Sequence, residues 1–305
     1  MKRAKRWLLA GEILAAIALS AGIGFLLRPV SYLDGWTYLR EDIAGVESRS
    51  ITVEGHRLHY EAEGPATGPA LVLVHGLGSR AEDWQTLAPL LAKAGFRVYL
   101  PDLFGYGRSD WPADFSYSVR DQAGVVLAFM DAMGLKQADL GGWSMGGWIA
   151  QIVAGEHPER VRRLLLFDSA GLAVQPNWNT NLFMPRTAAE LDQLEALLMP
   201  HPASIPGFVE RDVVRGAQEH AWVTRRALNT MLTGADATDS LLPTLKMPVL
   251  ILWGAEDRVT PPDQAERIHQ LIPQSELKTF IGCGHLAPEQ CAGTMSPIVV
   301  SFLER

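Results

Sequence analysis

Short apolar runs, separated by polar stretches and by segments of helical period, recur along most of the chain. Runs of this kind that are rich in β-branched residues and bounded by turn residues are typical of buried strands. The first two runs favour a hairpin, and the later ones alternate with helices. This order predicts an α/β fold with a mostly parallel, eight-stranded sheet that carries helices on both faces. The predicted strands lie at about 50–54, 57–62, 70–74, 96–100, 138–142, 163–168, 248–253 and 276–281.

The alternation breaks between the sixth and seventh predicted strands. Residues from about 172 to 240 combine helical periods, as in 190–198, with scattered prolines. We therefore expect a helical insertion between strands 6 and 7. Its apolar side chains, among them Phe183 and Met184, must pack partly on each other, and together they indicate a hydrophobic pocket.

A long apolar segment lies near the N-terminus. Residues 7–27 form a run of 21 residues that is broken only by Glu12 and Ser20. As a helix this run is about 31 Å long, which matches the hydrocarbon core of a bilayer. Basic residues at positions 2, 3, 5 and 6 precede it, so the positive-inside rule places the N-terminus in the cytoplasm. We expect a single-pass membrane protein, with residues 1–27 as anchor and the folded domain outside the cytoplasm, in the periplasm if the source is bacterial.

A cleaved signal peptide is the alternative, because small residues at Ala18 and Ser20 allow cleavage before Ala21. The protein would then be secreted. In the anchored protein residues 28–47 form a juxtamembrane connector. Its Trp36 and Tyr38 either rest among lipid headgroups or pack against the folded domain.

Composition narrows the rest of the chain. With 305 residues and 48% hydrophobic content, residues 48–305 are sufficient for one large domain. The net charge of −7 comes without a basic stripe in the folded part, which argues against nucleic acid as a partner. Cys283 and Cys291 lack zinc-site spacing and are too few for a disulfide framework, so we expect packed, inert thiols. Nothing in the sequence suggests a metal or organic cofactor.

One short motif carries candidate chemistry. Residues 142–146, Gly-Trp-Ser-Met-Gly, follow directly on the fifth predicted strand. They fit Gly-x-Ser-x-Gly, in which a serine occupies a strained turn between a strand and a helix with its hydroxyl above the sheet. By itself this pattern is weak, because glycine and serine are common. Three further features of the sequence support it. His75-Gly76-Leu77 follows the third predicted strand, Asp257 follows the seventh, and His285 follows the eighth.

From about Ser48 to the C-terminus the chain resembles the α/β-hydrolase superfamily. Serine, acid and histidine come in the order of that family along the chain, unlike in the chymotrypsin or subtilisin types. The resemblance implies that the insertion at about 172–240 is a cap over an active site. Five motifs stand in family order: His75-Gly76, Asp-Leu-Phe-Gly-Tyr-Gly-Arg-Ser at 102–109, the serine turn at 142–146, Trp-Gly-Ala-Glu-Asp at 253–257, and Gly284-His285.

The same resemblance implies a role for each candidate residue. Ser144 is the expected nucleophile, His285 its base and Asp257 the acid that orients the histidine. Glu256 and Asp168 are rivals for the acid, since some relatives place it after the sixth strand. The backbone N–H groups of Met145 and Leu77 are the expected oxyanion hole. Candidate substrate contacts are Trp143, Phe183 and Met184.

An apolar cap, a serine triad and a membrane anchor together suggest a carboxylic ester with an apolar acyl chain. The sequence Ser-Met-Gly-Gly at 144–147 is similar to monoacylglycerol-lipase-like members. It also occurs in carbon–carbon bond hydrolases of aromatic ring-cleavage products, which are the alternative. Those enzymes usually carry a polar residue where this chain has Trp143, and they act unanchored in the cytosol. A non-catalytic scaffold is a third possibility, disfavoured because all three triad positions are filled.

Overall fold

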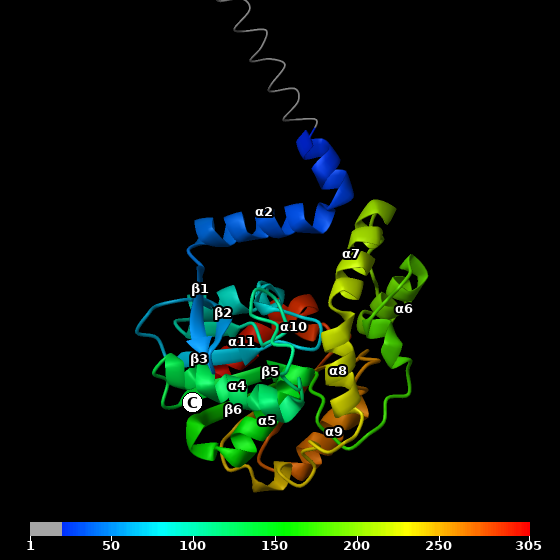
Figure 1. Ribbon diagram of the computed structural model, residues 1–305. Helices are drawn as coiled ribbons and strands as arrows, with labels where there is room; N and C mark the ends of the chain where they lie inside the picture. Colours follow the sequence, from blue (N-terminus) through cyan, green and yellow to red (C-terminus); the bar gives the residue numbers. More distant parts are fainter. Residues whose placement is uncertain (1–19) are drawn as a thin grey trace, which may run out of the picture.

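The computed structural model describes residues 20–305, and its strands follow the predicted ones closely (Figure 1). The strands are β1 (Glu47–Val53), β2 (His56–Glu63), β3 (Ala70–Val74), β4 (Arg97–Pro101), β5 (Ala138–Trp143), β6 (Val161–Phe167), β7 (Val249–Gly254) and β8 (Glu276–Phe280). The α-helices are α2 (Pro29–Ala44), α3 (Ala88–Lys93), α4 (Val119–Ala132), α5 (Met145–Glu156), α6 (Ala188–Leu198), α7 (Gly207–Glu219), α8 (Ala221–Met231), α9 (Pro262–Leu271), α10 (Ala287–Gln290) and α11 (Ala292–Leu303). Short 3₁₀ turns are η1 (Ala81–Trp84), η2 (Pro158–Arg160), η3 (Thr180–Phe183) and η4 (Leu242–Thr244).

All eight strands form one sheet, in the order β1-β2-β4-β3-β5-β6-β7-β8. The hairpin β1–β2 is antiparallel, as is the pairing of β2 with β4, and every later pairing is parallel. The predicted fold class is therefore confirmed. Because β5, β6, β7 and β8 run parallel, their carboxyl ends lie along one edge of the sheet, where open α/β sheets bind ligands.

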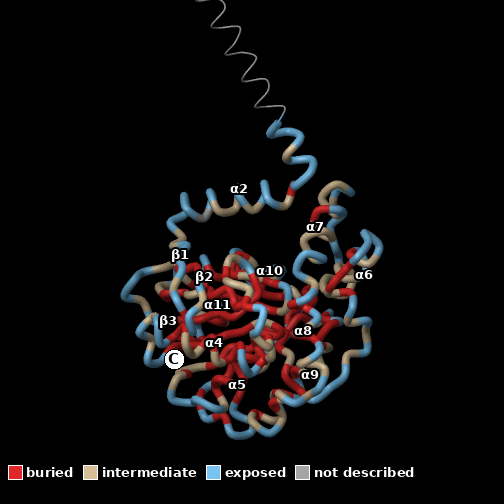
Figure 2. Tube along the Cα trace, in the orientation of Figure 1, coloured by how far each residue is buried: buried red, intermediate tan, exposed pale blue. Residues whose placement is uncertain are grey.

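Alternate side chains of each central strand enter two different cores. In β3, Val72 and Val74 pack with α4, α5 and α9, whereas Leu71 and Leu73 pack with α3 and α11 on the opposite face. The period of two comes from the pleat of a strand, and it explains why the central strands are unbroken apolar runs. Figure 2 shows the resulting burial as red through the centre of the molecule.

The insertion predicted between strands 6 and 7 is helical. Helices α6, α7 and α8 all follow β6 and precede β7, and they stand together on one side of the sheet in Figure 1. Their side chains contribute to cavities over the carboxyl ends of the strands, as described below.

The N-terminal part of the described chain leaves the globular core. Residues 20–27 are helical, and α2 follows after a break at Arg28. Within residues 20–305 no helix is both long and apolar enough to cross a membrane. Most of the predicted span at 7–27 lies outside the described residues, so the anchor stays a prediction.

Helix α2 has one face attached to the core and one face exposed. Asp34 binds Arg80 at 2.6 Å, and the Val30 N–H donates to Asp212 at 2.9 Å. The two aromatic residues singled out in the connector differ: Tyr38 stacks under Arg108, 4.3 Å from guanidinium to ring centre, whereas Trp36 is 60% exposed. Further exposed apolar side chains on α2 are Tyr32, Leu33, Leu39 and Ile43.

Candidate active site

Ser144 occupies a strained turn between β5 and α5. Its backbone has φ 56° and ψ −118°, a conformation that L-residues rarely adopt. Residues in such conformations are concentrated at functional sites. A Cβ on Gly142 would overlap the carbonyl oxygen of Gly146, so only glycine fits two residues before the serine. The strained geometry therefore follows from the glycines of the motif, and it holds the serine side chain at the carboxyl edge of the sheet.

His285 and Asp257 come from two other loops at that edge and meet Ser144 there. The Ser144 Oγ lies 2.8 Å from Nε2 of His285, and Nδ1 of the same ring lies 2.8 Å from Oδ2 of Asp257. All three side chains are buried. The chain of bonds has the geometry in which a histidine takes a serine proton while a carboxylate stabilises the imidazolium.

The Asp257 carboxylate is held by the turn that follows it. Its Oδ1 accepts the N–H groups of Val259 and Thr260 at 2.8 and 2.9 Å, and its Oδ2 accepts the Thr260 hydroxyl at 2.7 Å. The same hydroxyl lies 3.2 Å from Nδ1 of His285. Thr260 was not among the sequence candidates, although its place three residues after an aspartate is typical of a local side-chain turn.

Asp168, the rival acid at the end of β6, lies beside Asp257, but among the described residues His285 Nδ1 is bonded to Asp257 and Thr260 rather than to Asp168. It is fully buried, its Oδ1 accepts the Gly254 N–H at 2.7 Å, and its Oδ2 has no partner among the described residues. Burial, and then the neighbouring Asp257 carboxylate, raise the pKa of Asp168 well above its usual value. We infer a neutral carboxylic acid, unsuited to stabilising an imidazolium. Glu256, the other rival, instead accepts the Gly282 N–H at 3.2 Å.

The loop that carries His285 is tethered on several sides. The backbone N–H of His285 donates to the carbonyl of Leu198 at the end of α6 at 2.9 Å, and the His285 carbonyl accepts the Trp143 indole N–H at 2.7 Å. Within the loop, the Gly284 N–H donates to the Gln290 side chain at 2.8 Å. The base is thereby connected both to the cap and to the residue before the serine.

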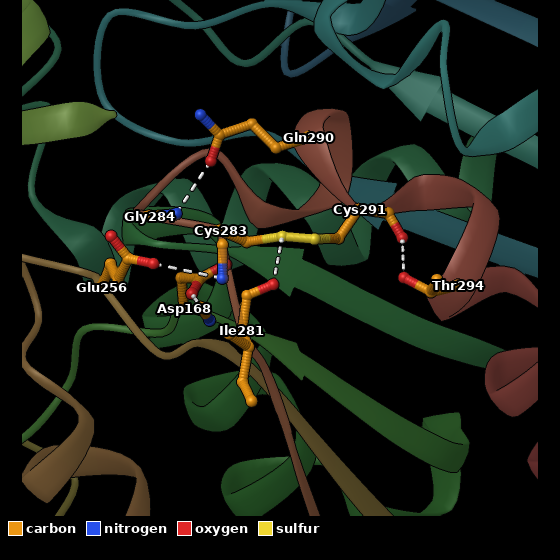
Figure 3. Close-up of a disulfide and its surroundings, with 10 residues drawn as sticks. Asp168, Glu256, Ile281, Cys283, Gly284, Gln290, Cys291 and Thr294 are labelled. Carbon is orange, nitrogen blue, oxygen red and sulfur yellow. Dashed lines mark hydrogen bonds between the residues drawn. A yellow bond between two sulfur atoms is a disulfide. The ribbon is translucent and has the colours of Figure 1, made fainter. Parts of the chain in front are cut away.

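A disulfide closes the same loop, which corrects the expectation of two free thiols. Cys283 and Cys291 are bonded across a sequence separation of eight, with Cα atoms 6.3 Å apart, a normal spacing for a disulfide. Figure 3 shows the bridge running from the strand-end loop to the start of α11, with the Gly284–Gln290 bond beside it. The sequence argument failed because only the fold brings these residues together.

The loop after β3 lies against the serine turn. A Cβ on Gly76 would stand 3.3 Å from that of Ser144. Burial lowers the pKa of His75, so its neutral ring accepts the Leu103 N–H at 3.1 Å and donates to the Gly76 carbonyl at 2.8 Å. Asp102 accepts the Ala81 N–H at 2.8 Å at the far end of the loop. These bonds fix the backbone around Leu77, while Met145 begins α5, where backbone N–H groups lack helical acceptors.

Two cavities open on Ser144. The first, of about 300 Å³, is bordered by Trp148, Leu172, Trp178 and Leu228, and none of the described residues lining it carries a charge. We call it the apolar cavity. The second, of about 330 Å³, also reaches His285 and is bordered by Asp83 and Glu289; we call it the acidic cavity.

Comparison with known proteins identifies the family to which this fold and site belong. The sequence profile of the alpha/beta hydrolase fold family matches residues 69–290. The chain belongs to this family.

The hydrolase is similar to proteins of two different activities. It is 28% identical to Lipase 3 of Moraxella sp. (strain TA144), over 79% of both chains. It is 30% identical to 2-hydroxymuconate semialdehyde hydrolase of Pseudomonas sp. (strain CF600), over 84% of this chain and 93% of that one. Among solved structures, a bacterial membrane phospholipase A described as a virulence factor superposes with a TM-score of 0.84, at 27% identity and 98% coverage of both chains.

Of the three residues expected to contact substrate, two border the cavities on Ser144 and one does not. Phe183 borders both the apolar and the acidic cavity, and Trp143 borders the acidic one. Met184 is buried in the cap and lines neither cavity; its carbonyl accepts the Gln218 side chain. Among residues 20–305 no three acidic, histidine or cysteine side chains are grouped to hold a metal ion.

Proposed function

We propose that this hydrolase cleaves carboxylic esters with apolar acyl chains through an acyl-enzyme on Ser144. His285 takes the serine proton while the serine oxygen attacks the ester carbonyl, and Asp257 stabilises the resulting imidazolium. The N–H groups of Leu77 and Met145 bind the oxyanion. Each donor lowers the activation barrier by about 3–4 kcal/mol. The histidine proton then passes to the leaving alcohol, and water releases the acid.

The observation that carries this proposal is the uncharged apolar cavity that opens on Ser144. An alkyl chain gains from transfer into such a cavity in proportion to the area it buries. Similarity to a lipase and to a phospholipase A supports the same reading.

Carbon–carbon bond hydrolysis is the second candidate, because the muconate semialdehyde hydrolase is an equally near relative. The substrate in that name is a carboxylate, and an anion in a site of low polarity needs a cationic or hydrogen-bonding partner. The apolar cavity offers no basic side chain among its described lining, and the acidic cavity offers carboxylates. These charges favour ester hydrolysis.

We further propose that the N-terminal segment anchors the hydrolase in a membrane, with residues 1–6 in the cytoplasm and the catalytic domain on the far side. The apolar sequence of 7–27 supports this, and so does the exposed apolar face of α2, since single-sided faces of this kind lie in the bilayer interface. Secretion after cleavage before Ala21 is the alternative.

The first test is hydrolysis of p-nitrophenyl esters from acetyl to palmitoyl by the full chain in detergent, beside Ser144→Ala. We expect a serine-dependent optimum at medium or long chains. A folded protein that is labelled by a fluorophosphonate probe but cleaves no ester would favour carbon–carbon hydrolysis. A folded protein that is not labelled at all would favour the scaffold hypothesis.

A further inference from the structure

The chemistry of the proposed reaction assigns one side of the site to the leaving group. When the bond between carbonyl carbon and alcohol oxygen breaks, the departing oxygen takes its proton from Nε2 of the histidine. The alcohol must therefore lie beside His285. Of the two cavities on Ser144, the acidic cavity is lined by His285 and the apolar cavity is not. The acyl chain accordingly fills the apolar cavity and the alcohol the acidic one.

The acidic cavity continues away from the serine into a third cavity of about 440 Å³ that reaches Val30 in α2. The two share a border that includes Ser79, Asp83 and Phe183. Together they offer an alcohol group more room than methanol or ethanol would need.

Some of the charged side chains that line these two cavities are neutralised by a partner, and others are not. Arg80 is the one arginine or lysine among the described residues that line the two cavities, and Asp34 neutralises it at 2.6 Å. Asp212 is likewise neutralised by Arg215, and it also accepts the Val30 N–H at 2.9 Å. Burial lowers the pKa of His220, so that ring is neutral.

Two carboxylates, Asp83 and Glu289, form no ion pair among the described residues, although the charges of Asp83 and Arg80 attract each other. Asp83 accepts the Ser79 hydroxyl at 2.6 Å and the Arg80 N–H at 3.1 Å, both neutral donors. Glu289, on α10, borders the same cavity and is exposed to solvent. Partial burial and then the charge of the Asp83 carboxylate raise the pKa of Glu289, and both side chains border the acidic cavity.

We propose that Asp83 and Glu289 make the acidic cavity a subsite for alcohols that donate hydrogen bonds and carry no negative charge. Free hydroxyls of a glycerol unit, or an ammonium group, are matched to carboxylate acceptors. A phosphate or carboxylate on the alcohol meets like charge, which is costly at an interface. This inference rests on the proposed ester hydrolysis and names the alcohol portion of its substrate.

The test uses three octanoyl esters below their critical micelle concentrations: 1-octanoylglycerol, octanoylcholine and 1-octanoylglycerol 3-phosphate. They share one acyl chain, so the apolar cavity sees the same group in each. We expect the full chain to cleave the phosphate ester with a kcat/KM at least about tenfold below that of the glycerol ester, a gap that narrows at high salt. The choline ester is expected to match or exceed the glycerol ester.

Glu289→Gln keeps the shape of the side chain and removes its charge. We expect it to raise kcat/KM for the phosphate ester about tenfold and to change that for the glycerol ester less than about threefold. Glu289→Lys should favour the phosphate ester further. Glu304→Gln is the matched control, since this exposed residue lies beside Arg162 near the amino ends of the strands; it makes the same change in net charge and should leave the ratio as it is.

Equal cleavage of phosphate and glycerol esters by the unchanged protein would overturn the proposal. So would an equal rise for both esters in Glu289→Gln. If p-nitrophenyl octanoate is not cleaved either, ester hydrolysis itself is refuted; cleavage of that reference separates failure of the subsite from failure of the proposed function.

Discussion

Trp143 precedes the proposed nucleophile and also holds the proposed base. Its indole N–H donates to the carbonyl of His285 at 2.7 Å, and its ring borders the acidic cavity. The residue was selected from the sequence as a substrate contact. In the structure it is in addition a positioning residue, because it ties the serine turn to the histidine loop.

Trp143→Phe should lower kcat roughly threefold to tenfold, the value of one lost hydrogen bond, with a smaller change in KM. The phenyl ring keeps most of the packing, so the melting temperature should fall by only a few degrees. The rate of fluorophosphonate labelling should fall in parallel with kcat. Unchanged kcat with a raised KM would show that Trp143 acts only on the substrate.

Asp257 and Asp168 should respond differently to the same substitution. Asp257→Asn removes the charge that stabilises the imidazolium and should lower kcat by about three to four orders of magnitude. Asp168→Asn replaces a neutral acid by a neutral amide and should keep kcat within about tenfold. Measuring kcat for both variants decides the question, and the reverse ranking would move the triad acid to the end of β6.

Asp168 also predicts a pH dependence of stability. Its pKa is raised in the folded state, so the folded protein retains a proton that the unfolded chain releases above a pH of about 4. This carboxyl therefore contributes stability at low pH, and the contribution is lost as the pH rises toward the folded-state pKa. An asparagine has no such loss, so Asp168→Asn should melt at a progressively higher temperature than the unchanged protein between pH 4.5 and 8. A constant difference across that range would contradict a neutral Asp168.

Among the elements, the histidine loop and its disulfide form the part of the site most open to disruption. Closing a loop of this length removes about 2–3 kcal/mol of unfolded-state freedom. Cys283→Ser combined with Cys291→Ser should lower the melting temperature accordingly. Because Gly284 and His285 lie inside the loop, kcat should also fall at temperatures where the variant is folded. Loss of stability with unchanged kcat and labelling rate would mean that the disulfide has no effect on the base.

The strands were the most predictable elements. The run predicted at 70–74 is β3 (Ala70–Val74), and that at 248–253 is β7 (Val249–Gly254), because burial on both faces requires an unbroken apolar sequence. For helix α2, the sequence leaves open whether Trp36 and Tyr38 face lipid headgroups or the folded domain. The apolar stripe of this helix faces away from the core, and a sequence does not state which side of a helix a protein covers.

The site was predictable as far as its motifs reach. Ser144, Asp257 and His285 follow strands at recognisable spacings, and the structure brings them within hydrogen-bond distance; their roles remain our proposal. The backbone bond from His285 to Leu198 joins the active-site loop to the cap, and Asp83 of η1 and Glu289 of α10 border one cavity. Contacts of that kind depend on tertiary packing, which no local pattern in the sequence records.

For the whole molecule, the exposed apolar face of α2 predicts that this helix binds membranes in addition to the predicted anchor at residues 7–27. The full chain should float with lipid vesicles. A chain of residues 28–305 should still float in part, and Trp36→Ser with Ile43→Ser should abolish this, because both side chains are more than half exposed. Tyr38→Ser is the comparison, since Tyr38 faces Arg108. If all truncated forms float equally, or if none of them floats, the proposal that α2 contacts the membrane is wrong.

The attachment of α2 to Arg80 affects how this protein should be compared with others. The family profile begins at residue 69, so α2 falls outside the segment by which relatives are recognised. Yet α2 supplies Val30 to a cavity wall and Asp34 to the arginine that stands three residues beyond Leu77. Two members of the family with identical recognised segments but different N-terminal helices would differ in the wall of the cavity that we propose for the alcohol. Classification by the shared segment alone would assign them one substrate range.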